Sequence, residues 1–102
     1  MIELSSKQRK VLEKHAQRFQ SVVIVGQGGV TEAVEKMTDS VLAVHELVKI
    51  SFNEFKEQKR ELSANLAEKC GATLVRVIGN KAILYRPAKN ADERKYEKLL
   101  DM

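Results

Sequence analysis

Apolar residues in the first half of the chain recur at helical spacing in two segments and form short continuous runs in two others. In the first helical segment, which runs to about Arg18, one side of a helical wheel collects Leu4, Val11, Leu12, His15 and Phe19, and Ser5 and Ser6 are of a type that caps helix starts. The β-branched run Val22–Val25 predicts a buried strand. Thr31 begins a second helical pattern, which leads to an apolar run at 47–50. The predicted order is therefore helix, strand, helix, strand.

A third helix and a pair of strands are predicted in the second half. Asn53 can cap this helix, Phe55 is expected on its inner face, and Gly71 is placed to end it. Strands over 74–78 and 81–86 follow. Strand–helix–strand units imply parallel neighbours, whereas the last pair is antiparallel. The sequence thus predicts an α/β (α+β-like) fold with the order α-β-α-β-α-β-β and a mixed four-stranded sheet packed with helices.

The pair Gly79-Asn80 joins the last two strands through a two-residue turn and so fixes their register. The turn pairs Ile78 with Lys81, Val77 with Ala82, Arg76 with Ile83, Val75 with Leu84 and Leu74 with Tyr85. One face of these strands is apolar and is expected to face the core: Val75, Val77, Ala82 and Leu84. The opposite face is expected to be at least partly open and to bear Lys49, Arg76, Lys81 and Tyr85.

Length and charge narrow the class of protein. A chain of 102 residues suffices for one domain, which we expect over residues 1–87, with a polar tail over 88–102 that includes a short helix at 92–100. Residues 1–30 and 71–102 each carry three more cations than anions, which favours a polyanionic partner such as nucleic acid.

A membrane span and a signal peptide are not expected. The single cysteine, Cys70, fits a reducing, cytoplasmic location.

Three of the five glycines lie in the segment Gly26-Gln27-Gly28-Gly29, between a predicted strand and a predicted helix. Glycine lets a ligand approach the backbone, and a helix start favours anions, so this segment is a candidate phosphate site. A simple turn that redirects the chain is the alternative. A nucleotide P-loop is excluded because no Lys-Ser/Thr pair closes the motif, and the spacing is poor for a dinucleotide site. The segment fits the G-x-x-G loop that clamps single-stranded RNA.

Cations on the first helix are the second candidate: Lys7, Lys10, Lys14 and Arg18 form one stripe. They can contact phosphates or form an ordinary solvated face, and the helix's two acids lie off the stripe. Tyr85, beside Arg76 and Lys81, can stack on a base or pack under the first helix.

Catalytic chemistry is not indicated. His15 and His45 are far apart in sequence, and histidine and cysteine lack metal-ligand spacing. Acids on the third helix alternate with bases, as on a solvated, ion-paired surface. We therefore expect no enzyme activity, no metal, no cofactor and no small-molecule substrate.

Four segments, 4–10, 25–31, 46–50 and 78–87, resemble the YhbY-like family, the stand-alone bacterial form of the CRM (chloroplast RNA splicing and ribosome maturation) domain. The resemblance runs from Leu4 to Pro87. It implies a domain related to the C-terminal domain of translation initiation factor three, RNA binding, and association with precursors of the large ribosomal subunit. The family's G-x-x-G loop maps onto residues 26–29, and no catalytic residue carries over.

The sequence therefore predicts an RNA-binding factor for large-subunit assembly, acting as a monomer without a membrane partner. The alternative is a protein–protein adaptor that uses either the acids of the second helix or the tail: Glu32, Glu35 and Asp39, or Tyr96, Leu99 and Leu100. A small enzyme acting on a phosphate ligand is the least favoured alternative.

Overall fold

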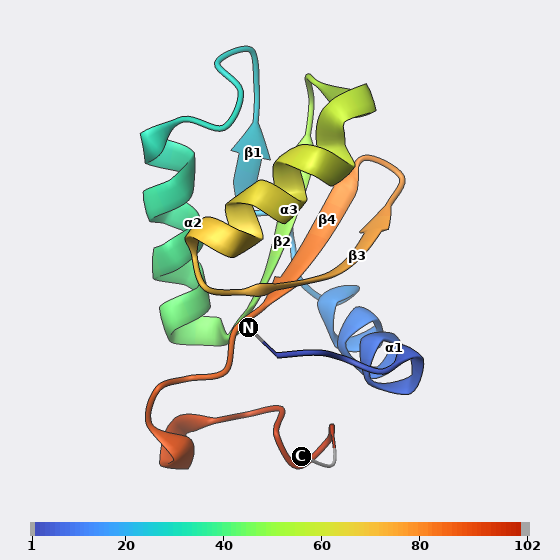
Figure 1. Ribbon diagram of the computed structural model, residues 1–102, viewed down its shortest axis with the longest axis vertical. Helices are drawn as coiled ribbons and strands as arrows, with labels where there is room; N and C mark the ends of the chain where they lie inside the picture. The colour runs from blue at the N-terminus through green and yellow to red at the C-terminus, as the bar shows by residue number, and fades with distance from the viewer. Residues whose placement is uncertain (1, 101–102) are drawn as a thin grey trace.

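The computed structural model describes residues 2–100 (Figure 1). Its elements are α1 (Ser6–Ala16), β1 (Val23–Val25), α2 (Glu32–His45), β2 (Leu47–Phe52), the 3-10 turn η1 (Lys56–Gln58), α3 (Lys59–Lys69), β3 (Thr73–Ile78), β4 (Lys81–Tyr85) and the 3-10 turn η2 (Ala91–Glu93). The predicted order α-β-α-β-α-β-β is confirmed.

The four strands form one mixed sheet in the order β1-β2-β4-β3. β1 runs parallel to β2, while β4 is antiparallel to both β2 and β3. Helices α2 and α3 pack on one face of this sheet, and α1 packs on the other (Figure 1). The mixed four-stranded sheet packed with helices is thus confirmed.

Each face of the sheet has its own apolar core. Leu42 of α2 and Leu66 of α3 pack with Ile50 and Leu84 on one face. On the other face, Leu12 of α1 belongs to a second cluster that also includes the following residues of the sheet and the C-terminal segment: Leu47, Val75, Ile83, Tyr85, Tyr96 and Leu100. The C-terminal segment is therefore part of the folded domain.

Local signals place the helix starts of α1 and α2 as expected. The Ser5 hydroxyl accepts from the Gln8 amide while the Gln8 side chain accepts from the Ser5 amide, which is a capping box. The Thr31 side chain caps α2 by accepting from the Val34 amide. The expected Asn53 cap of the third helix is wrong, because helical structure begins only at η1, after Phe55 in a left-handed conformation.

The hairpin register is confirmed near the turn and wrong beyond it. Arg76 pairs with Ile83 as predicted, but Leu74 pairs with Leu84, so that Val75 is an extra residue in a β-bulge. An extra residue reverses the side to which a side chain points. Val75 consequently packs on the α1 side of the sheet and Leu74 against the core of α2 and α3.

The C-terminal segment folds back beneath α1 (Figure 1). In place of the helix expected over 92–100, it forms η2 and a turn closed by the Leu100 amide on the Tyr96 carbonyl. The buried Glu46 carboxylate accepts from the amides of Ala88 and Lys95 and so fixes the segment to the end of α2.

Candidate nucleic-acid interface

The glycine loop, Gly26–Gly29, is a β-turn between β1 and α2 that is exposed at Gln27 and Gly28 and half-buried at Gly26 and Gly29. The Gly29 amide donates to the Gly26 carbonyl over 3.0 Å, and Gln27 and Gly28 are the central residues of the turn. Within residues 2–100, the amides of Gly26, Gln27 and Gly28 donate to no other part of the protein. One of the four loop amides is thus used by the fold, and three can receive a ligand.

The backbone conformation does not require glycine at two of the loop positions. Gly26 and Gly28 lack a positive φ. A Cβ on Gly26 would meet nothing within 4 Å, and one on Gly28 would lie 3.3 Å from Thr31 Cγ2. Gly29 differs, because its φ of 72° favours glycine. At the other two positions, glycine leaves room for a group that approaches the loop from outside.

The start of α2 contributes less to an anion site than the sequence indicates. Glu32 and Glu35 occupy its first turn, where they complement the helix dipole and repel a phosphate. Lys36 pairs with Glu32 over 3.1 Å. The loop amides, and not the helix terminus, are therefore the favourable part of this site.

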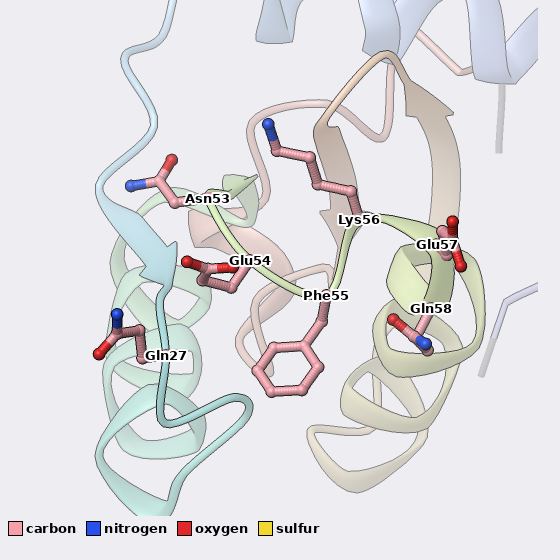
Figure 2. A pocket seen from close by; sticks show the side chains of 7 residues that line it. All are labelled: Gln27, Asn53, Glu54, Phe55, Lys56, Glu57 and Gln58. Carbon is pink, nitrogen blue, oxygen red and sulfur yellow. The ribbon is translucent and has the colours of Figure 1, made fainter.

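A groove of about 640 Å³ lies beside the glycine loop (Figure 2). It is lined by Gln27 of the loop and by residues 53–58, which connect β2 to α3. The Phe55 ring points toward the loop, and its Cε2 would lie 3.4 Å from a Cβ on Gly29. The expectation that Phe55 lies on the inner face of a helix is wrong, because the chain turns at this residue and leaves 42% of it exposed.

A second hollow, which we call the basic groove, lies between α1, α3 and the edge strand β3. It contains Arg9 and Lys10 of α1, Arg60 of α3 and Arg76 of β3. The Arg9 guanidinium donates to the carbonyls of Leu74 and Val75, which holds the β-bulge in place. Arg76 pairs with Glu13 over 3.1 Å. Lys10 and Arg60 are exposed and, within the part of the chain that the structure describes, form no ion pair.

The other predicted cations form two sets: those exposed on α1, and two lysines that donate hydrogen bonds to the chain between α1 and β1. Lys7, Lys14 and Arg18 are exposed on α1, as the stripe predicts. Lys49 is half-buried, and its ammonium donates to the Phe19 carbonyl. The exposed Lys81 donates to the Ser21 hydroxyl. Lys49 also shares a hollow with Arg18 near the start of β1.

Only part of the sheet face that was predicted to be open is accessible to solvent. Ile24 and Ile78 are exposed beside Lys81, on the part of the face that α1 leaves uncovered. Tyr85 is 1% exposed, because it packs under α1, and it cannot stack on a ligand. Burial, followed by the nearby Glu46, raises the pKa of Tyr85 to about 12. The stacking role expected for Tyr85 is therefore wrong.

Metal binding and nucleophilic chemistry are the two other kinds of site that the sequence raises. No group of three or more histidine, cysteine, aspartate or glutamate residues in this range could hold a metal ion. Burial, followed by the charge of Asp39, raises the pKa of the Cys70 thiol and favours its protonated, weakly nucleophilic form. No helix within the described range is long and apolar enough to cross a membrane.

The chain is similar to known proteins over most of its length. The chain matches the model of the CRS1 / YhbY (CRM) domain over residues 4–86. A Haemophilus influenzae protein named RNA-binding protein is 33% identical over 92 residues, which is 89% of this chain and 93% of that protein. The Bacillus subtilis protein named probable RNA-binding protein YqeI is 31% identical over 87 residues, or 84% of this chain and 91% of that protein.

The fold is also found in a solved structure. The solution structure of a Staphylococcus aureus protein superposes with a TM-score of 0.75 at 33% sequence identity. The superposition covers 91% of this chain and 98% of the other. The similarity therefore extends over most of the chain.

Proposed function

The chain belongs to the CRS1 / YhbY (CRM) domain family, and we propose that it is an RNA-binding protein that contacts ribosomal RNA during assembly of the large ribosomal subunit. The observation that carries the proposal is the glycine loop, where three backbone amides are unbonded and neither Gly26 nor Gly28 has a positive φ that would require glycine. RNA binding agrees with the names of the relatives. The assembly role follows from the resemblance to the YhbY-like family.

The glycine loop suits a phosphate of a single-stranded backbone. Amides that converge at a tight turn form a concavity that binds anions. The absence of side chains at Gly26 and Gly28 lets the phosphate approach these amides closely. Such contacts position an RNA strand without reading its sequence.

The basic groove supplies a second set of phosphate contacts. η1 lines the groove beside the glycine loop, and α3, which follows it directly, brings Arg60 into the basic groove. Lys10 and Arg76 complete that set. An RNA strand can thus run from the loop along the start of α3 to α1 (Figure 1). Further cations are available for phosphates beyond this path: Lys7, Lys14, Arg18, Lys49 and Lys81.

The test is the substitution Gly28→Asp, measured as binding of a fluorescent single-stranded rRNA fragment. A carboxylate placed on the turn repels the phosphate and fills the space that it needs. We expect the affinity to fall at least about tenfold, because a hydrogen bond to a charged group contributes about 1.5–3 kcal/mol. Gly28 lacks a positive φ, so a side chain there needs no unusual backbone conformation, but its Cβ would lie 3.3 Å from Thr31 Cγ2 and require a small shift of that methyl group.

Two variants serve as controls for this test. Gly28→Ala adds a methyl group without charge and should weaken binding less than Gly28→Asp. Ser40→Asp adds the same charge at an exposed position on α2 and should bind like the parent. Parental affinity of the Gly28→Asp protein would refute the assignment of the loop.

The adaptor alternative loses most of the surface proposed on the tail. Tyr96 and Leu100 are buried against α1, which removes two of the three tail residues from contact with a partner. On α2, Glu35 pairs with Lys69 and Asp39 with Arg86. If the protein stays bound to its partner after ribonuclease digestion, direct RNA contact is not what holds the complex together. As an RNA-binding module we expect it to act as a monomer in the cytoplasm.

A further inference from the structure

Phe55 combines exposure with an unfavourable backbone conformation. Of the chain's three phenylalanines and two tyrosines, all within the described residues, only Phe55 is exposed. Its φ of 57° and ψ of 36° lie in the left-handed region, which a bulky side chain rarely occupies. The side chain does not extend the apolar core, since it belongs to neither core cluster. Packing of the two apolar cores therefore does not account for an aromatic residue at this position.

The left-handed turn determines where the Phe55 ring lies. The ring projects from the β2–α3 connection toward the glycine loop, with its edge near Gly29 (Figure 2). The same groove contains the exposed side chain of Gln27, which sits between two of the unbonded loop amides. A ligand with its phosphate on the loop would thus have its adjoining group beside the ring.

The chemistry of the groove favours an uncharged, flat group over a second phosphate. Glu54 and Glu57 line it and repel anions, while Lys56 supplies one compensating cation. The amide side chains of Asn53 and Gln58 can both donate and accept hydrogen bonds, as the edge of a nucleobase requires.

We propose that Phe55 is a stacking platform for an unpaired nucleobase whose neighbouring phosphate binds the glycine loop. This inference rests on the proposed RNA-binding function and adds the element that holds a base. Every base has a π-face, so the platform accepts unpaired RNA of varied sequence. Paired RNA is disfavoured, since its bases already stack on one another and their edges are engaged.

The test uses the absence of tryptophan from this chain. In the Phe55→Trp variant, the new indole is the sole tryptophan, and stacking on a base should quench its fluorescence. The probes are a non-self-pairing single-stranded RNA of about ten nucleotides and long-chain inorganic polyphosphate, which carries the charge without bases. We expect quenching by RNA and none by polyphosphate. Val44→Trp, an exposed position near the far end of α2, should respond to neither.

Affinities of two further variants test the role of the flat ring. Phe55→Ala should bind the RNA roughly 5- to 150-fold more weakly than the parent, with unchanged affinity for polyphosphate. Phe55→Leu retains apolar bulk without a π-face and should also be weakened, whereas Phe55→Trp should bind at least as well as the parent. Should Phe55→Ala fail to fold, the fluorescence of Phe55→Trp decides the matter alone.

The outcomes separate this inference from the proposed function. If the parent binds RNA and loses it on Gly28→Asp, but Phe55→Trp is not quenched and Phe55→Leu binds normally, the stacking site is refuted and the proposed function stands. If the parent does not bind single-stranded RNA, the proposed function itself fails. Equal quenching by RNA and polyphosphate would overturn base stacking, since it would report backbone charge alone.

Discussion

Replacing Lys10 by glutamine removes one positive charge from the basic groove and should reduce the salt dependence of RNA binding. Lys10 is exposed on α1 and shares this groove with Arg60 and Arg76. Each phosphate neutralised on a single strand contributes about −0.7 to the slope of log affinity against log salt. Three phosphates at Lys10, Arg60 and Arg76 give a parental slope of roughly −2.1, and the uncharged amides of the glycine loop add nothing to it.

The slope converts directly into affinities. Between about 50 and 200 mM salt the parent should lose affinity roughly 20-fold, and Lys10→Gln roughly sevenfold. Arg60→Gln should give the same reduction, since Arg60 also lacks an ion-pair partner within residues 2–100. The assay is fluorescence anisotropy of a labelled single-stranded rRNA fragment across a salt series.

A matched control comes from the C-terminal segment. Lys89 is exposed there and lies outside the basic groove, so that Lys89→Gln should keep the parental slope. Parental slopes for both Lys10→Gln and Arg60→Gln would refute the reasoning, because the groove would then contribute no phosphate contact.

Two predictions concern the packing of the C-terminal segment. Glu46→Gln should lower the free energy of unfolding by about 1–3 kcal/mol, because the buried carboxylate accepts from the Ala88 and Lys95 amides and an amide can accept from only one of them. Urea unfolding followed by circular dichroism measures this, and an unchanged midpoint would contradict it. Tyr85, whose pKa burial raises to about 12, binds its proton more tightly in the folded state than in the unfolded state, where the pKa is about 10. The contribution of Tyr85 to the free energy of unfolding should therefore stay constant up to about pH 10. It should then fall by on the order of 2 kcal/mol toward pH 12, and urea unfolding across this range measures the decrease. Titration of both tyrosines near pH 10 in the folded protein, followed by tyrosinate absorbance, would contradict this.

The order of elements was predictable because local signals decide it. The Ser5 and Thr31 caps, the β-branched run at 22–25 and the Gly79-Asn80 turn act through neighbours in sequence, and the structure has each of them where expected. The glycine loop also stood out, since its composition is visible without a fold. Its unbonded amides agree with the phosphate interpretation, although binding itself stays a prediction.

Long-range packing decided what the sequence could not. Whether Tyr85 faces solvent depends on where α1 crosses the sheet, and α1 covers it. The β-bulge at Val75 is held by the Arg9 side chain, which is distant in sequence, so no feature of the hairpin predicts it. The position of Phe55 is predicted wrongly for a related reason. An apolar residue near a predicted helix start is expected to face the core, and only the tertiary structure shows that the chain turns at Phe55.

The sequence by itself determined the succession of helices and strands, the bare loop between β1 and α2, and the excess of cations near both ends of the chain. These properties depend on residue type and on spacing along the chain. Only the tertiary structure decided which cations share a groove, which face of the sheet α1 covers, and that the Phe55 ring lies beside the glycine loop. Those relations join residues from separate elements, and their geometry is set by how the two cores pack on the sheet.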